Sequence, residues 1–161
     1  MQPVKMIDVG HKLVTVRTAE ASGSLLLQLK TLEHIRAGEL AKGDAINTAR
    51  VAGIMAAKRT AEFVPLCHPL PLDAVDVDIR FDRGGDGRRA AVTATAKVVT
   101  SAKTGVEMEA LTAVAAALMT LYDMAKSIDR DMVISDIQLD TKTGGSRGNY
   151  VRSDGAAAPS E

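Results

Sequence analysis

The feature that most constrains the fold is a hairpin pattern in the middle of the chain. From residue 74 to residue 81, apolar and charged residues alternate, which predicts a strand with one buried face. The run Gly-Gly-Asp-Gly at residues 84–87 is typical of a hairpin turn. Residues 90–100, rich in valine and threonine, form the expected returning strand. The fold must therefore contain an antiparallel strand pair.

The segments before the hairpin predict strands and helices in alternation. The apolar run at residues 24–30 indicates a buried strand, and a short helix over residues 31–37 ends at Gly38. Asp44 is the expected N-cap of a helix that runs to about residue 62. One side of this helix carries mostly small residues, which favours close packing on a sheet or on another helix. That side comprises Ile46, Ala49, Gly53, Ala56 and Thr60.

The order of elements predicts the fold class. After the hairpin, Thr104 and Glu107 form a capping-box signature for a long helix that ends near residue 128, and residues 132–139 form a last strand. From residue 24 the order is β-α-β-β-α-β, which predicts an α+β ferredoxin-like sandwich with helices on one face of an antiparallel sheet. An extra N-terminal strand over residues 13–19, followed by a turn at Ser22 and Gly23, extends the sheet or pairs with a neighbouring subunit.

Length and composition narrow the function classes. The 161 residues predict one domain over residues 1–152 and a disordered tail over 153–161. Twenty basic residues balance twenty acidic ones and only 2% are aromatic, which argues against a nucleic-acid binder. The single Cys67 excludes a disulfide framework, and no metal-ligand spacing is evident. No apolar stretch has the length of a signal peptide or membrane span, which predicts a soluble cytoplasmic protein. Because no metal-ligand spacing is evident, we expect no metal, and we expect no cofactor.

Two loop segments carry residue types suited to chemistry. Lys42 precedes a helix N-terminus, where anions bind readily, although a solvated loop lysine is the commoner explanation. Prolines at 65 and 69 hold Cys67 and His68 in defined directions, so that His68 can bind a substrate or move a proton. A loop packed by its prolines explains this segment about equally well.

Three further segments lie on or after the long helix. Glu107 and Glu109 suit the positive end of the helix dipole. Asp123 and Lys126 are three positions apart on the same helix face, where they either tune each other's pKa or form an ordinary surface ion pair. The glycine loop at residues 144–148 wraps phosphates or leads into the tail. Glu109 and Asp123 lie about 21 Å apart along one helix. The site is therefore elongated or assembled between subunits.

Taken together, these segments resemble a known family. Residues 42–72 (KGDAINTARVAGIMAAKRTAEFVPLCHPLPL), 103–134 (KTGVEMEALTAVAAALMTLYDMAKSIDRDMVI) and 7–19 (IDVGHKLVTVRTA) are similar to the molybdenum-cofactor biosynthesis protein C (MoaC) family. The resemblance implies conversion of (8S)-3′,8-cyclo-7,8-dihydroguanosine 5′-triphosphate to cyclic pyranopterin monophosphate with release of pyrophosphate. It also implies a hexamer, a trimer of dimers with active sites between subunits. The expected ligand is this small molecule, and no nucleic-acid or membrane partner is expected.

The resemblance also implies roles for individual residues. The catalytic set falls on Asp123, Lys126 and Lys42. The substrate-binding residues fall on Leu66, Cys67, His68, Glu107, Met108, Glu109 and Arg17.

One loop departs from the family pattern. GGSRG stands here where the family reads GGKSG, with Ser146 in the lysine position and Arg147 next to it. A diverged paralogue that binds a purine nucleotide or pterin without catalysis is therefore an alternative. An oligomeric scaffold without a small-molecule site is a third, and it leaves the matched polar residues unexplained.

Overall fold

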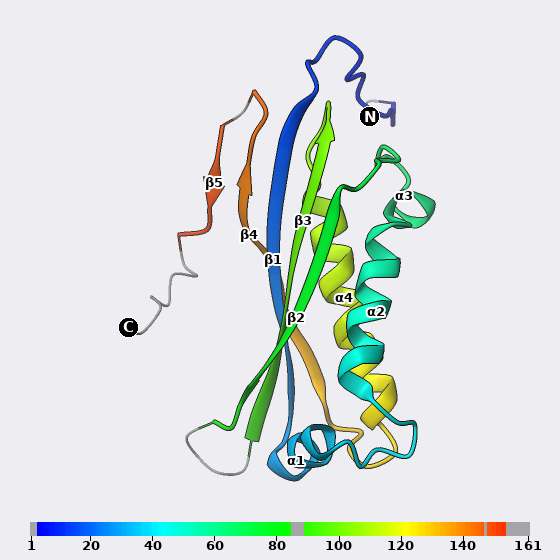
Figure 1. Cartoon of the computed structure of the whole chain (residues 1–161), viewed down its shortest axis with the longest axis vertical. Coiled ribbons are helices and arrows are strands. Elements are labelled where there is room, and N and C mark those ends of the chain that lie inside the picture. The colour runs from blue at the N-terminus through cyan, green and yellow to red at the C-terminus, as the bar shows by residue number, and fades with distance from the viewer. Residues whose placement is uncertain (1–2, 85–88, 147, 154–161) are drawn as a thin grey trace.

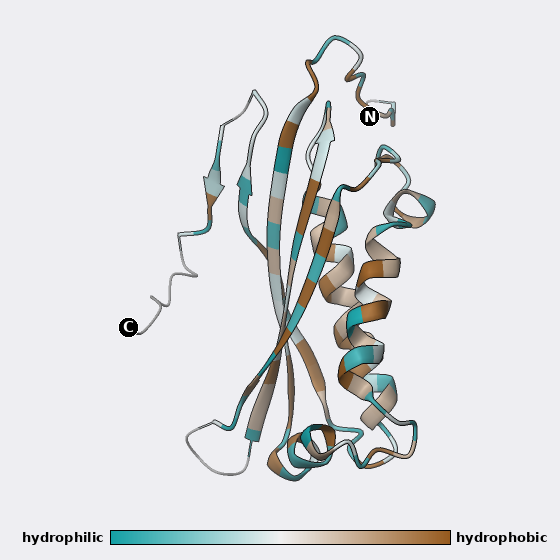
Figure 2. Ribbon diagram, in the orientation of Figure 1, coloured by the Kyte–Doolittle hydropathy of each residue, from teal (hydrophilic) through white to brown (hydrophobic). Residues whose placement is uncertain are grey.

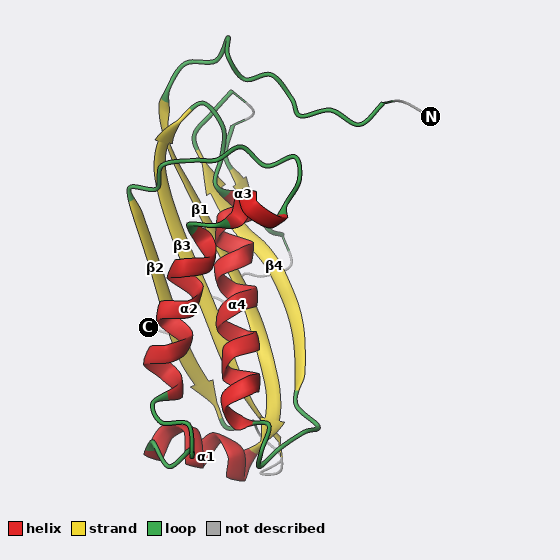
Figure 3. Ribbon diagram, turned by 90° about the vertical axis from the view of Figure 1, so that its right-hand side faces the viewer, coloured by secondary structure: helices red, strands yellow, loops and turns green. Residues whose placement is uncertain are grey.

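The computed structural model describes residues 3–84, 89–146 and 148–153, which form an α+β sandwich (Figure 1). One antiparallel sheet has the strand order β2-β3-β1-β4-β5, and the helices cover one of its faces (Figure 3). The elements are β1 (Thr15–Gln28), α1 (Leu29–Ala37), α2 (Ala45–Ala57), α3 (Thr60–Phe63), β2 (Ala74–Asp82), β3 (Arg89–Ala102), α4 (Glu107–Ala125), β4 (Val133–Thr143) and β5 (Tyr150–Val151). The predicted α+β ferredoxin-like class is confirmed.

The central hairpin is present as predicted. Strand β2 pairs antiparallel with β3 along its whole length, from Ala74 opposite Val99 to Asp82 opposite Ala91. Residues of alternating hydropathy follow each other along both strands (Figure 2). Residues 85–88, in which most of the expected turn falls, lie outside the described residues, as does the expected tail from residue 154 on.

The leading strand differs from the prediction. Residues 13–19 do not form a separate strand, because the chain runs through Ser22 and Gly23 without a turn and β1 is continuous. Gly23 pairs with Ala94 of β3, and a Cβ atom on Gly23 would lie 2.9 Å from the side chains of Leu118 and Val114. This glycine therefore permits the close approach of α4 to the sheet.

The helix boundaries also differ in part. Asp44 caps α2 as predicted, and its Oδ1 accepts a hydrogen bond from the Asn47 amide at 3.0 Å. The predicted single helix to residue 62 is wrong, because α2 ends at Ala57 and the short α3 follows. The capping box is wrong as well, since α4 begins after Val106 without a side-chain cap. Glu107 instead pairs with Lys142 of β4 at 3.2 Å.

Small residues let the two long helices pack closely on the sheet. A Cβ atom on Gly53 of α2 would lie 2.9 Å from the Ala113 carbonyl oxygen of α4, so the two backbones approach each other at this point. This confirms the predicted close packing of the small side of α2. Although α4 is long and apolar enough to span a membrane, 56% of its most apolar 18-residue window is buried inside the fold. Its apolar composition is therefore that of the core helix.

Candidate active site

The predicted site residues fall into two groups near opposite ends of α4. Asp123 lies in the last turn of this helix, near α1, whereas Glu107, Met108 and Glu109 form its first turn, near α3. Figure 1 shows α1 and α3 at opposite ends of the molecule. In each group, residues that are distant in the sequence lie together in the fold.

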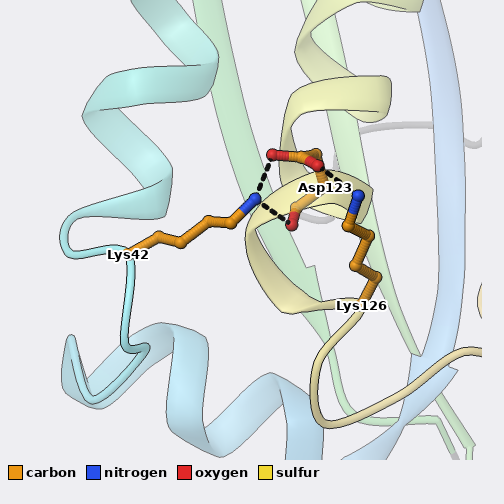
Figure 4. A network of polar contacts seen from close by, with 3 residues as sticks. All are labelled: Lys42, Asp123 and Lys126. Atoms are coloured by element: carbon orange, nitrogen blue, oxygen red, sulfur yellow. Dashed lines mark hydrogen bonds and ion pairs between the residues drawn. The ribbon is translucent and has the colours of Figure 1, made fainter.

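The first group is an ion-pair cluster of Lys42, Asp123 and Lys126 (Figure 4). The Asp123 carboxylate accepts from the Lys42 ammonium at 2.5 Å and from the Lys126 ammonium at 2.7 Å. Lys42 also donates to the Asp123 carbonyl oxygen at 3.0 Å. Lys126 is the C-cap of α4, and Lys42 reaches the cluster from the loop between α1 and α2. All three side chains are about half exposed, so a ligand can reach them.

The two lysines dominate the electrostatics of this cluster. The hydrogen bonds from Lys126 and then from Lys42 lower the pKa of Asp123 to about 2, and the same carboxylate raises the pKa of Lys126. In this geometry both pKa values therefore lie away from neutrality. Two ammonium groups on one carboxylate leave a net positive charge, which favours an anionic ligand.

The second group lines a cleft of about 630 Å³ near α3, formed by the N-terminal segment, the loop after α3, the start of α4 and the end of β4. Of the predicted binding residues, it contains Arg17, Leu66, Cys67, His68, Glu107 and Met108. The prolines around residues 65–71 keep the Cys67–His68 segment out of regular structure and present it to this cleft.

Arg17 is buried at the base of the cleft and is held by the backbone. Its Nε donates to the Ala102 carbonyl oxygen at 3.0 Å, and its Nη2 donates to the Lys103 carbonyl oxygen at 3.1 Å. A Cβ atom on Gly145 would lie 2.0 Å from Nη1, so the glycine loop leaves room for the guanidinium. Among the described residues no carboxylate pairs with Arg17.

Glu109 and Cys67 form a buried pair beside the cleft. The Cys67 thiol donates to Glu109 Oε1 at 3.5 Å, while Glu109 Oε2 is buried without a hydrogen-bond partner among the described atoms. Burial raises the pKa of Glu109, and burial together with the charge of Glu109 raises the pKa of Cys67 to about 11. Cys67 is therefore a thiol at neutral pH and is unsuited to act as a nucleophile.

Comparison with known proteins decides the family. The family model for the MoaC family matches residues 6–145. The chain belongs to the MoaC family. Cyclic pyranopterin monophosphate synthase 3 of Mycobacterium tuberculosis is 54% identical over 98% of this chain and 86% of the relative. Cyclic pyranopterin monophosphate synthase of Thermomicrobium roseum is 52% identical over 95% of this chain and 90% of the relative. The enzyme of the same name from Heliobacterium modesticaldum is 49% identical over 92% of this chain and 91% of the relative.

The geometry of this MoaC-family chain unites some predicted residues and separates others. Lys42, 81 positions from Asp123, meets it directly, whereas the cleft residues lie near the other end of α4. In the loop that departs from the family pattern, Ser146 lines the cleft, and Arg147 lies outside the described residues. Within the described part of the chain, no group of three or more His, Cys, Asp or Glu could hold a metal ion.

Sequence reasoning missed three basic residues of this cleft. Lys5 and Lys12 of the N-terminal segment and Lys142 of β4 all line it. Lys142 lies two positions before the glycine pair at residues 144 and 145, and this is a sequence signal that could have found it. Lys12 lies in the segment 7–19 that resembles the family, but no role was assigned to it there. Lys5 lies before that segment and carries no such signal.

Proposed function

We propose that this chain is a cyclic pyranopterin monophosphate synthase of molybdenum-cofactor biosynthesis, a lyase. It converts (8S)-3′,8-cyclo-7,8-dihydroguanosine 5′-triphosphate to cyclic pyranopterin monophosphate and pyrophosphate. The observation that carries the proposal is the similarity of nearly the whole chain to relatives that bear this enzyme's name. The reaction combines a ring rearrangement with closure of a cyclic phosphate, and the two groups of residues match these two demands.

The ion-pair cluster supplies groups for proton transfer. At neutral pH Asp123 is ionised and Lys126 is protonated, because each stabilises the charged form of the other. In the absence of a ligand, Asp123 is therefore a weak base and Lys126 a weak acid. A substrate anion that takes over one of the lysines frees the carboxylate and raises its pKa, so substrate binding itself makes Asp123 a stronger base.

Closure of the cyclic phosphate requires cations around the phosphate chain. Pyrophosphate leaves as negative charge builds up on the bridging oxygen, and positively charged side chains stabilise that charge. Arg17 and Lys42 are suited to this role, because Arg17 has no carboxylate partner among the described residues and Lys42 belongs to a cluster with excess positive charge. His68 lines the same cleft as Arg17 and is suited to hold or protonate the substrate.

The separation of the two groups supports an active site between subunits. Residues 109 and 123 lie about 21 Å apart along α4, too far for both ends to contact one reacting atom. A second copy of the chain that brings its cleft to the Lys42–Asp123–Lys126 cluster completes the site. We therefore propose a homo-oligomer, a hexamer built as a trimer of dimers, of one catalytic domain over residues 1–152 that acts in the cytoplasm.

Ser146 favours a second candidate function, binding of a purine nucleotide or pterin without turnover. Turnover of purified protein decides between the two. The protein is supplied with the cyclised dihydro-GTP, and pyrophosphate release and the pterin product are measured. Product formation that disappears in Lys126→Ala supports the synthase, and tight substrate binding without product supports the non-catalytic binder. A folded protein that neither binds nor converts the substrate contradicts both.

A further inference from the structure

We propose that the N-terminal segment, residues 5–12, forms one wall of the substrate cleft and that Lys5 and Lys12 bind the phosphate chain that leaves as pyrophosphate. The inference rests on the proposed function for the identity of the ligand. It assigns a role to two lysines that are not among the predicted catalytic or substrate-binding residues.

The position of the segment is the first argument. Residues 5–12 have no helix or strand, yet they are fixed to the body of the protein. The Lys103 ammonium donates to the Gly10 carbonyl oxygen at 2.7 Å, and the Lys103 carbonyl oxygen accepts from Arg17 at 3.1 Å. One residue therefore connects the N-terminal segment to the arginine at the base of the cleft. Lys5 and Lys12 line the cleft at this point.

The charge of the cleft is the second argument. Lys142 is neutralised by Glu107, to which it binds at 3.2 Å. Within the described part of the chain, the ammonium groups of Lys5 and Lys12 have no ion-pair partner, and Arg17 hydrogen-bonds only to carbonyl oxygens. Lys5 is exposed and Lys12 half-buried, whereas Arg17 is buried. These three positive charges around one cleft favour the binding of an anion.

The chemistry of the expected ligand is the third argument. Pyrophosphate carries several negative charges on a short chain, so it contacts more than one cation at once. In this sequence Ser146 replaces the lysine of the family's glycine loop and also lines the cleft. Lys5 and Lys12 line the same cleft and supply positive charge to it.

Binding of inorganic pyrophosphate to the full-length protein tests the inference without requiring turnover. Calorimetry at low and at physiological salt compares the wild type with Lys5→Ala, Lys12→Ala and a matched control, Lys58→Ala, which removes an exposed lysine outside the cleft. We expect each cleft variant to bind pyrophosphate about tenfold more weakly, as loss of a charge-assisted hydrogen bond predicts. Their affinity should also depend less on salt, whereas Lys58→Ala should match the wild type.

The position of the segment is tested through Lys103. In Lys103→Met the anchor to Gly10 is lost while both cleft lysines remain, so we expect weaker pyrophosphate binding and a higher KM with little change in kcat. Equal pyrophosphate affinity in the wild type, Lys5→Ala and Lys12→Ala overturns the inference, and substrate turnover by that same wild type would leave the proposed function intact. Conversely, lysine-dependent pyrophosphate binding by a protein without turnover supports the inference and contradicts the proposed function.

Discussion

Asp123 holds the most perturbed carboxyl group of the candidate active site, because two ammonium groups bind it at once. Its pKa of about 2 lies below the ordinary value of 3.8, and Lys126 contributes the largest part of the shift. We predict that Lys126→Met raises the pKa of the Asp123 carboxyl toward its ordinary value, as measured by the carbon chemical shift of the carboxyl group in an NMR titration. Because the folded-state pKa is lowered, this carboxylate stabilises the fold above about pH 3.8, and the contribution is lost as the pH falls toward 2.

Lys58→Met serves as the control for this titration. Lys58 is the C-cap of α2 and is exposed, so the Asp123 titration should not change in that variant. An Asp123 pKa that is the same in the wild type and in Lys126→Met would contradict the ion-pair geometry.

Glu109 is the opposite case, a buried carboxyl group whose pKa is raised. Glu109→Gln keeps the shape and removes the buried charge, so we predict that it stabilises the protein at pH 8 by about 1–3 kcal/mol, the cost of an unsatisfied buried group. At pH 4 the wild-type carboxyl is largely protonated in the folded and unfolded states, and the two proteins should unfold alike. Thermal unfolding at both pH values measures the difference. If Glu109→Gln is less stable than the wild type at pH 8, the Glu109 carboxylate must have a stabilising partner.

For individual residues, the sequence predicted a side-chain contact between neighbours on one helix and missed contacts between residues far apart in the chain. Three positions separate Asp123 from Lys126, which is enough to place both on one helix face, and this ion pair was predicted. The bond from Lys42 spans 81 positions and the bond from Cys67 to Glu109 spans 42. Such contacts depend on how the loops pack against α4, and no periodic pattern encodes that packing.

The packing of α2 on α4 depends on one glycine. Alanine favours the helix interior over glycine by about 1 kcal/mol, yet a Cβ on Gly53 would lie 2.9 Å from a backbone oxygen of α4 that has little freedom to move. We predict that Gly53→Ala lowers the free energy of unfolding by about 1–3 kcal/mol, as overpacking does, when measured by urea denaturation. Val51→Ala on the exposed side of α2 is the control and should be neutral. Stabilisation by Gly53→Ala would mean that the helices can separate at little cost.

The elements themselves were largely predictable, and the errors have a common cause. Alternation located the hairpin, and the Asp44 cap located the start of α2. Gly23 was interpreted as a turn residue because a Ser-Gly pair is a turn signal, but its role is to make room for Leu118 and Val114 of a helix 90 residues further on. Similarly, Glu107 fitted a local cap, but it pairs with Lys142 of β4. Local rules fail where a distant contact decides the role of a residue.

At the scale of the whole molecule, a single chain leaves the two groups of functional residues unconnected. The cations and His68 of the cleft lie near one end of α4, and the Lys42–Asp123–Lys126 cluster lies near the other. Each group leaves positive charge without compensation, so each can hold part of one anionic substrate. Joining both parts in one site requires that the cleft of one copy face the cluster of another.

Mixing two inactive variants tests this arrangement. His68→Ala removes a cleft residue, and Asp123→Asn removes the carboxylate of the cluster while keeping its size. In a mixed oligomer, a site formed by the cleft of an Asp123→Asn chain and the cluster of a His68→Ala chain is intact.

If chains associate at random in a dimer, half of the dimers are mixed and each has one intact site of two. We therefore predict about a quarter of the wild-type turnover after the two variants are denatured and refolded together, and almost none from either alone. The contrary outcome is a mixture that forms oligomers of wild-type mass but turns over no faster than the average of the two variants. A partner cannot restore a site that lies within one chain, so this outcome would show that each chain carries its own complete site.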